Sequence, residues 1–294
     1  MRILINCTGF IGDILFASSV AEQLYVQAST GDEDHKQVVV DYLIHLYQPY
    51  ELLCNNPFIN QVHLFDCDRS IYDTIYNLHE IDFNVQPPKY YQMQCGIENP
   101  TTEFKVYTNK AFDAAVAKTL QPLKDQGLKV VAYLNNWEER SFIFTQEQYE
   151  RGIDVPNLGY GGSHRNINWI IEQLNKQQDL ILIPVGMPPG YNAREADFNN
   201  VSEYSMQASF LKNCDYFIGA EGGLCNLAAG VGTNTIITED FIHQLYGWNG
   251  VLRKIQEPKL GPKYYFTDVA HLGLNPYLTD KEVVEQITKY IINE

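Results

Sequence analysis

The stretch Asp215-Tyr-Phe-Ile-Gly-Ala-Glu-Gly-Gly-Leu-Cys-Asn-Leu-Ala-Ala-Gly-Val-Gly232 joins an apolar segment, an acidic-glycine turn and a helical pattern. Tyr216 to Ile218 have the composition of a buried strand, and apolar residues recur at helical spacing after Gly222 and Gly223. Two glycines let the backbone approach a ligand closely, and free amides at a helix start attract phosphate. The stretch therefore predicts a phosphate-binding turn, with an ordinary strand-to-helix connection as the alternative.

The composition is that of a folded soluble protein. The chain has 294 residues, of which 45% are hydrophobic and 19% charged. This length favours two domains of ordinary size. The sequence contains no run of about 18 apolar residues that would span a bilayer. Its first residues lack the apolar core and cleavage site of a signal peptide, so we expect a cytoplasmic protein without an integral membrane segment.

Charge and cysteine content exclude several classes of partner. The formal net charge is -15, whereas nucleic acid and anionic membrane surfaces are bound through clustered Lys and Arg. We therefore expect no nucleic-acid partner. The six cysteines form no CxxC pair and no spacing suited to zinc, which favours reduced, mostly buried thiols and no metal site.

Both halves of the chain begin with a predicted strand and then alternate strands with helices, a pattern typical of parallel sheets. Gly127 follows a helix at the position where a C-terminal glycine is favoured, so we predict domains at 1–127 and 128–294. The predicted strands are Arg2 to Asn6, Val38 to Ile44, Gln61 to Phe65, Thr74 to Leu78, Lys129 to Leu134, Asp179 to Pro184, Asp215 to Ile218 and Thr235 to Thr238; the main predicted helices are Ile14 to Ala28, Ala111 to Lys124, Asn168 to Gln177 and Ser205 to Asn213.

Two doubly wound domains predict where a ligand binds. In such folds the ligand lies outside the carboxyl ends of the strands, in the loops. Two domains facing each other through these loops would form a cleft. In this arrangement the last helix can pack back on the N-terminal domain.

Three segments of the N-terminal half resemble glycosyltransferase family 9, the heptosyltransferase-like enzymes of the two-domain GT-B fold. Met1-Arg-Ile-Leu-Ile-Asn-Cys-Thr-Gly-Phe-Ile-Gly-Asp-Ile-Leu15 looks like the opening strand of that family, with Gly12-Asp13 matching its Gly-Asp pair. Glu51-Leu-Leu-Cys-Asn-Asn-Pro-Phe-Ile-Asn-Gln-Val62 is similar to the segment ending in Asn-Pro-x-Ile-Asp-x-Val. Tyr72-Asp-Thr-Ile-Tyr-Asn-Leu78 looks like its Tyr-Asp-x-x-Ile-Asp-Leu strand.

The fourth matching segment is the acidic-glycine turn itself. Gly219 to Thr233 resembles the nucleotide-sugar signature Asp-Thr-Gly-Leu-x-His-x-Ala-Ala-x-x-Gly-x-Pro, for which several members carry Glu-Gly-Gly-Leu. This sequence departs from the signature at two positions: Asn226 stands where the family usually has His, and Asn234 where it usually has Pro. The four segments occur in the family's order and cover nearly the whole chain.

The resemblance implies an inverting transfer of a sugar from a nucleotide diphosphate, without an obligatory metal or a cofactor. On this basis Asp13 is the candidate base that accepts the proton of the acceptor hydroxyl, and Thr8, Gly9 and Gly12 line the acceptor side. The alternative role for Asp13 is to cap the N-terminus of the first helix, for which aspartate is well suited.

The donor side is predicted from the second half. Backbone amides of Gly222, Gly223 and Leu224 would hold the diphosphate, and Glu221 would bind sugar or ribose hydroxyls unless it only caps the helix. Asn226 can still form hydrogen bonds there, but it cannot relay protons as His can. The further candidates are Arg165 as a cation for the departing diphosphate, with Arg140 as its alternative, and Glu195 as a ribose ligand.

The charge balance bears on the acceptor, because a body at -15 is repelled by a phosphorylated membrane glycolipid. We expect an acceptor that is not strongly anionic, either a glycan or a protein hydroxyl. Two other functions remain open at this stage. One is a nucleotide-sugar-binding protein with impaired turnover, suggested by the departure at Asn226, and the other is a GT-B-like sugar-nucleotide epimerase.

Overall fold

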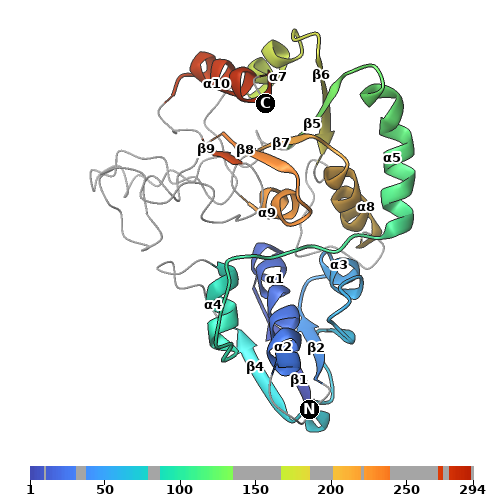
Figure 1. The fold of residues 1–294 in the computed structure, drawn as a ribbon, viewed down its shortest axis with the longest axis vertical. Coiled ribbons are helices and arrows are strands. Elements are labelled where there is room, and N and C mark those ends of the chain that lie inside the picture. The colour runs from blue at the N-terminus through green and yellow to red at the C-terminus, as the bar shows by residue number, and fades with distance from the viewer. Residues whose placement is uncertain are drawn as a thin grey trace.

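The protein consists of two parallel α/β sheets stacked end to end (Figure 1). The computed structural model describes residues 1–9, 11–30, 38–78, 87–134, 167–185, 201–219, 222–238, 271–273 and 278–292. The first sheet carries β1 (Arg2–Cys7), α1 (Ile11–Ala17), α2 (Ser19–Thr30), β2 (Val39–Ile44), α3 (Tyr50–Cys54), β3 (Gln61–Leu64), the 3-10 turn η1 (Arg69–Ile71), β4 (Thr74–Leu78) and α4 (Pro87–Gln94).

Four parallel strands form this first sheet in the order β3-β2-β1-β4. The order reverses at β1, which places the topological switch point at the carboxyl end of that strand. Ile3, Ile5 and Cys7 alternate along β1 and are buried in the main hydrophobic core. Leu4 on the opposite face is also fully buried, so β1 is the buried strand that the sequence predicts.

The second sheet has five parallel strands in the order β6-β5-β7-β8-β9. Its centre is β7, with a fully buried pattern that suits a parallel strand covered on both faces. Its elements are α5 (Lys110–Lys124), β5 (Lys129–Leu134), α7 (Ile167–Leu174), β6 (Leu180–Val185), α8 (Val201–Lys212), β7 (Tyr216–Gly219), α9 (Gly223–Gly230), β8 (Asn234–Ile237), β9 (His271–Gly273) and α10 (Asp280–Ile292).

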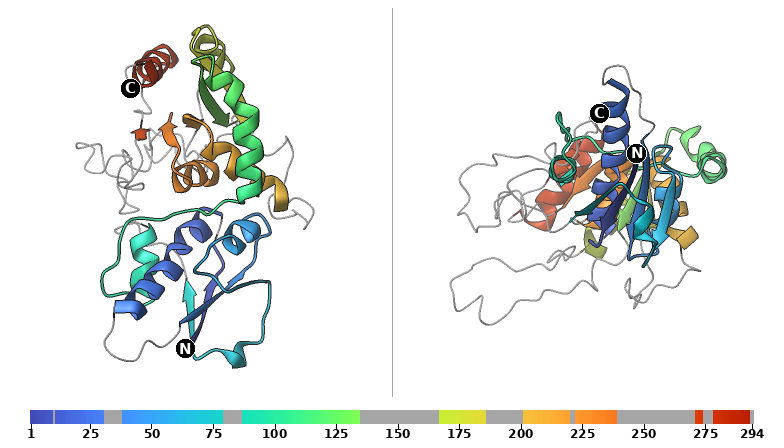
Figure 2. Two further views of the ribbon diagram at one scale, coloured as in Figure 1. Left: turned by 45° about the vertical axis from the view of Figure 1, so that its right-hand side comes forward. Right: turned by 90° about the horizontal axis from the view of Figure 1, so that it is seen from below.

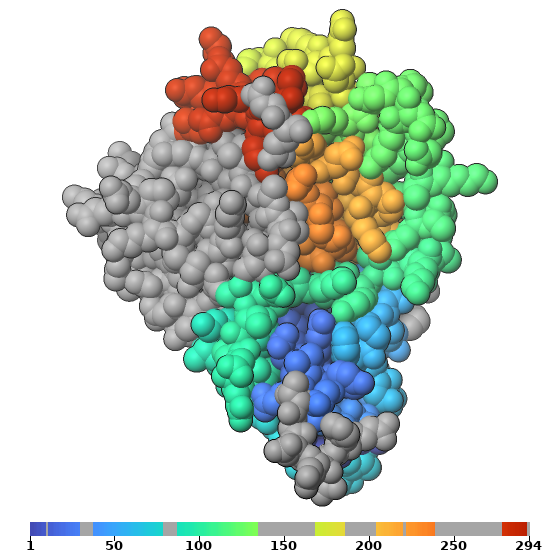
Figure 3. All heavy atoms as spheres, viewed as in Figure 1, coloured from blue at the N-terminus to red at the C-terminus, as the bar shows by residue number. Residues whose placement is uncertain are grey.

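Each sheet with its helices is called a unit below. The carboxyl ends of the strands in the first sheet point towards the second unit (Figure 2). The stretch between α4 and α5 crosses the boundary between the units, where it lies on the surface (Figure 3). Phe104 stacks edge-on against Phe16 of α1 with ring centroids 4.8 Å apart. The next contact reaches the second unit, because the amide of Val106 donates to the carbonyl of Gly230 at 2.8 Å. The crossing segment therefore packs on both units.

Helix α5 packs against the second sheet. It contacts α8 and β5, and Lys124 Nζ lies 3.0 Å from Asp215 Oδ1. Lys212 of α8 reaches Asp113 of α5 at 2.6 Å. Because these contacts join α5 to the second unit, we propose a domain boundary within 98–109 in place of one after Gly127. Gly127 does end the helix as predicted, with a φ of 78° that suits glycine.

The last helix, α10, packs on the second unit. Its described neighbours are α7 and the amino ends of β5 and β7: Lys129 Nζ donates to the carbonyl of Ile291, and the rings of Tyr290 and Tyr216 are 6.0 Å apart. Val283, Ile287 and Ile291 form its buried stripe. These contacts of α10 lie on the second unit, and its packing back on the N-terminal domain stays a prediction.

Helix boundaries differ most from the prediction after β1. The first helix begins at Ile11 instead of Ile14, and a break at Ser18 separates it from α2. The Ser18 hydroxyl donates to the carbonyl of Leu15 at 2.7 Å, a local bond that competes with regular helix pairing. Asp13 consequently lies inside the first turn of α1, so its predicted alternative role as the N-cap is wrong.

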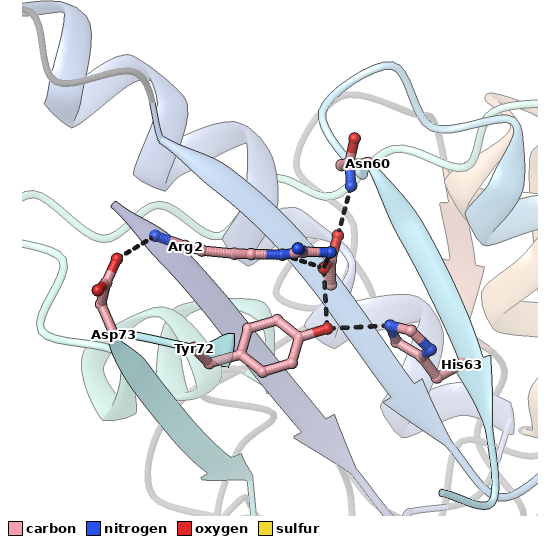
Figure 4. A network of polar contacts seen from close by, with 6 residues as sticks. Arg2, Asn60, His63, Tyr72 and Asp73 are labelled. Atoms are coloured by element: carbon pink, nitrogen blue, oxygen red, sulfur yellow. Dashed lines mark hydrogen bonds and ion pairs between the residues drawn. The ribbon is translucent and has the colours of Figure 1, made fainter. Parts of the chain in front are cut away.

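A buried polar network ties the amino-terminal part of the first sheet together (Figure 4). Asp41 is 0% exposed; its Oδ2 accepts from Arg2 Nε at 2.9 Å, from Arg2 Nη2 at 2.8 Å and from the Tyr72 hydroxyl at 2.8 Å. Its Oδ1 accepts from Asn60 Nδ2 at 2.8 Å. Since the one Tyr72 proton goes to Asp41, the His63 Nε2 atom 2.9 Å away is the donor to the phenol oxygen.

This network holds the short crossover from β3 to β4, which contains η1 and Tyr72 in place of a full helix. Burial and the hydrogen bond to Asp41 raise the pKa of Tyr72, so it stays a donor. No helix among the described residues is long and apolar enough to cross a membrane.

Candidate functional site

Asp13 lies at the switch point of the first sheet, in the turn that follows β1. A Cβ atom added at Gly9 would come within 2.5 Å of Asp13 Cβ and 2.7 Å of its Oδ2. Only glycine leaves room for this carboxylate to fold back over the turn. Gly9, predicted on the acceptor side, and Asp13, the predicted base, are thus in steric contact, and Thr8 beside Gly9 is exposed.

Tyr91 of α4 supports this carboxylate from the side of the core. Its hydroxyl donates to Asp13 Oδ1 at 3.1 Å, while the residue as a whole is 2% exposed. Burial and the nearby charge of Asp13 raise the pKa of Tyr91 far above its ordinary value. The phenol is therefore protonated at every physiological pH and remains a fixed donor to the carboxylate.

Cys7 is the other reactive group close to Asp13. It ends β1 and is 1% exposed. Burial raises the pKa of its thiol to about 12, with a further contribution from the charge of Asp13. Cys7 therefore stays protonated and fills the core, because a buried thiol is a poor nucleophile.

On the second unit, α9 begins directly after the acidic-glycine turn. Gly222 is its N-cap, with φ 154° and ψ -173°, a region of backbone conformation essentially restricted to glycine. The amide of Asn226 donates to the carbonyl of Gly222 at 3.0 Å, which closes the first turn. In general, the first amides of a helix lack a carbonyl partner within the helix, and such groups bind anions in other proteins.

The two turns meet. A Cβ at Gly12 would lie 2.6 Å from Asn226 Nδ2, and a Cβ at Gly223 would lie 3.5 Å from the side chain of Ile11. Asn226 is only 6% exposed, so its amide is held against α1 instead of projecting into solvent. Glycines on both sides let the starts of α1 and α9 approach this closely.

The structure thus brings together Gly9, Gly12 and Asp13 from the first unit with Gly222, Gly223 and Asn226 from the second. Leu224 is half-buried and packs on the core. Three predicted donor-side residues lie outside the described residues: Arg165, Glu195 and Glu221. The same holds for Arg140, the alternative cation. Among the residues that are described, no group of three or more His, Cys, Asp or Glu side chains could hold a metal.

Two tyrosines at the site were missed from the sequence. Tyr91 lies on α4, whose polar composition hides its helical pattern, although Pro87-Pro88 at the helix start is a recognisable signal. Tyr204 of α8 is buried, and its hydroxyl lies 3.5 Å from the carbonyl of Gly223. No sequence pattern links either tyrosine to a turn so distant along the chain.

The architecture matches solved glycosyltransferases over its full length. ADP-heptose lipopolysaccharide heptosyltransferase II of E. coli aligns with 100% of this chain and 99% of its own, with a TM-score of 0.60 and 10% identity. A family 9 glycosyltransferase of Veillonella parvula aligns with 100% of this chain and 97% of its own, at a TM-score of 0.59 and 10% identity. The chain has the GT-B fold.

A third GT-B structure, the E. coli heptosyltransferase WaaC with ADP-2-deoxy-2-fluoro heptose, aligns with 99% of this chain and 100% of its own. Its TM-score is 0.51, at 12% identity. No protein-family model matches the sequence, and no curated protein matches it. The resemblance inferred from four short motifs is thus supported at the level of fold. At sequence identities this low, structural similarity shows a shared backbone arrangement and does not show that individual residues have the same chemistry.

Proposed function

We propose that the protein is an inverting, metal-independent glycosyltransferase that moves a sugar from a nucleotide-diphosphate donor to a hydroxyl of a glycan or a protein. One observation carries this proposal: the start of α1, which bears Asp13, contacts the start of α9 through Gly12 and Asn226. In a two-sheet fold with ligands at the carboxyl ends of the strands, this contact puts a carboxylate beside a glycine-rich helix start.

The proposed reaction is a single displacement. The acceptor oxygen attacks the anomeric carbon, and the bond from that carbon to the diphosphate breaks with the electron pair leaving on the diphosphate. The Asp13 carboxylate takes the hydroxyl proton as general base. The hydrogen bond from Tyr91 to Oδ1 orients the carboxylate.

The leaving diphosphate needs positive partners. Backbone amides of Gly223 and Leu224 at the start of α9 supply donors that are already oriented, which lowers the cost of developing charge. We propose Arg165 as the side-chain cation, Glu221 and Glu195 as ligands of donor hydroxyls, and Thr8 as an acceptor contact.

A second candidate is a nucleotide-sugar-binding protein with impaired turnover. The observation that favours it is the placement of Asn226, whose amide is buried against Gly12. An amide held there can fix the distance between the units, but it cannot donate a proton as an imidazolium can. This candidate shares the donor site with the first and differs only in chemistry.

The test begins with a thermal-shift panel of nucleotide sugars, because a ligand that binds only the native state raises the melting temperature. ADP-linked sugars head the panel because WaaC was solved with one. A donor that raises the melting temperature is then incubated with glycan and peptide acceptors, and products are identified by mass spectrometry. Transfer supports the first candidate, whereas saturable binding without transfer or donor hydrolysis supports the second. An unchanged melting temperature with every donor would sink both.

A further inference from the structure

Three aromatic side chains gather at the carboxyl edge of the first sheet, away from the contact with α9. His45 and Tyr47 follow β2, and Phe65 follows β3. The Tyr47 and Phe65 ring centroids are 5.1 Å apart at 72°, and those of His45 and Phe65 are 6.2 Å apart at 65°. Both pairs have the edge-to-face geometry that aromatic rings favour. We call these three residues the aromatic edge.

Phe65 is held in an unusual backbone conformation. It has a φ of 69°, and it is the one non-glycine residue with a positive φ in the described part of the chain. The amide of Asp66 donates to the carbonyl of Leu64 at 2.8 Å, so Leu64, Phe65 and Asp66 form the rare, strained type of γ-turn. A bulky residue in this conformation costs free energy, and such strain clusters at ligand sites.

The strain does not serve to bury the ring. Phe65 is 47% exposed, so the turn presents a large apolar surface to solvent instead of to the core. Because Tyr47 and His45 meet the Phe65 ring edge-on, one face of this exposed ring remains open to solvent. Packing in the core therefore does not explain why the chain keeps a strained turn at Phe65.

Strand register relates the aromatic edge to Asp13. Cys7 at the end of β1 pairs with Ile44 of β2, and Ile44 pairs with Leu64 of β3. Neighbouring strands are about 4.8 Å apart, so Phe65 lies roughly 10 Å across the sheet from the end of β1. The turn that carries Asp13 and the aromatic edge are therefore on the same edge of one sheet.

Polar groups at this edge suit uncharged hydroxyls. Asn6 Nδ2 donates to Asn77 Oδ1 at 2.8 Å near the ends of β1 and β4. Asn6 is 8% exposed, and its Oδ1 has no hydrogen-bond partner within the described structure. The segments 45–48 and 65–69 hold two carboxylates, Asp66 and Asp68, and one cation, Arg69. Amides, carboxylates and aromatic faces bind sugars, and the excess of negative charge disfavours a phosphorylated acceptor.

We propose that the aromatic edge is an acceptor subsite that stacks on the apolar face of a neutral sugar ring. The proposal rests on the proposed transferase function and specifies its substrate class as an uncharged glycan. Phe65 supplies the stacking face, Tyr47 and His45 hold its ring edge-on, and the exposed Asn77 at the end of β4 offers hydrogen bonds to hydroxyls.

The test uses Phe65→Gly, because glycine accepts the positive φ and keeps the turn while removing the ring. Tyr25→Ala is the matched control, since Tyr25 is 52% exposed on α2 and lies outside the aromatic edge. Saturation-transfer NMR is recorded with lactose, maltose, cellobiose and chitobiose, and with glucose 6-phosphate for comparison. With the wild type, we expect a saturation-transfer signal from at least one neutral disaccharide. This signal should be lost or weakened about tenfold in Phe65→Gly and retained in Phe65→Tyr and in Tyr25→Ala.

Three outcomes overturn the proposal: no neutral sugar binds, the phosphorylated sugar binds better, or Phe65→Gly binds as the wild type does. The NMR readout requires no turnover, so it separates this proposal from the transferase function. Sugar binding without any nucleotide-sugar shift would refute the transferase function and leave the subsite standing. Nucleotide-sugar binding together with wild-type sugar binding by Phe65→Gly would refute the subsite and leave the transferase function standing.

Discussion

Asp41 and Asp13 are two carboxylates on the same unit, one within the first sheet and one just beyond it, and their surroundings differ completely. Asp41 is fully buried and accepts four hydrogen bonds, from Arg2, Tyr72 and Asn60. Asp13 is half-buried at the carboxyl edge, against a glycine and a buried tyrosine. A saturated carboxylate stabilises structure, whereas one that keeps access to the loops of two domains can accept a proton.

The largest expected effect is on the rate of sugar transfer, and it distinguishes the role of Asp13 from that of Asp41. Asp13→Asn should lower the rate of sugar transfer by about 10²–10⁴-fold, the usual contribution of a general base, with little change in melting temperature. Initial rates with the donor found by thermal shift provide the measurement. Asp125→Asn, at the exposed end of α5, is the matched control. Wild-type turnover in Asp13→Asn would exclude this residue as the base.

The second effect is on stability. Asp41→Ala should lower the free energy of unfolding by about 3 kcal/mol, because it leaves the donors of Arg2, Tyr72 and Asn60 facing a cavity. Urea denaturation followed by circular dichroism measures this loss. Transfer by the folded fraction should be unaffected, since Asp41 lies away from the site. A loss of activity without a loss of stability would instead give Asp41 a functional role and exclude the structural one.

Gly12 tests the contact between the two units. An alanine there should improve α1 on its own, but its Cβ would meet Asn226 Nδ2 at 2.6 Å in a buried place. We expect Gly12→Ala to cost about 1–3 kcal/mol, as overpacking usually does. In the Asn226→Ala background the same substitution should be neutral or stabilising. Additive effects in this double-mutant cycle would show that the contact does not constrain the units.

Tyr91→Phe should produce the smallest change, about a tenfold or smaller loss of turnover. The substitution removes the hydrogen bond from Tyr91 to the Asp13 carboxylate, and initial rates measure the effect. The raised pKa of Tyr91 also has a sign for stability: the contribution is complete below about pH 10 and is lost as the pH rises further. Tyr91→Phe should therefore lose less stability than the wild type between neutral and alkaline pH, as measured by urea denaturation. Wild-type turnover in Tyr91→Phe would limit Tyr91 to packing.

The sequence by itself determined β1 to β8 and their order along the chain, but not the three-residue β9. Apolar runs such as Lys129–Leu134, and the glycine that ends α5 at position 127, specify local structure through side-chain period and backbone freedom. These signals lie within a few residues of the element they predict. For the same reason Gly12, Asp13, Gly222 and Gly223 could be singled out as turn residues next to strands.

Only the tertiary structure decided which of these residues meet. Tyr91 reaches Asp13 across 78 positions of sequence, Gly12 approaches Asn226 from the other unit, and α5 joins the second sheet although its sequence suits either half. Such contacts depend on how buried surfaces fit together, and packing leaves no periodic trace in the chain. The sequence therefore identified the acidic-glycine turn and Asp13, and the fold decided that Tyr91 contacts Asp13 and that Gly12 approaches Asn226, because those contacts join segments far apart in the chain.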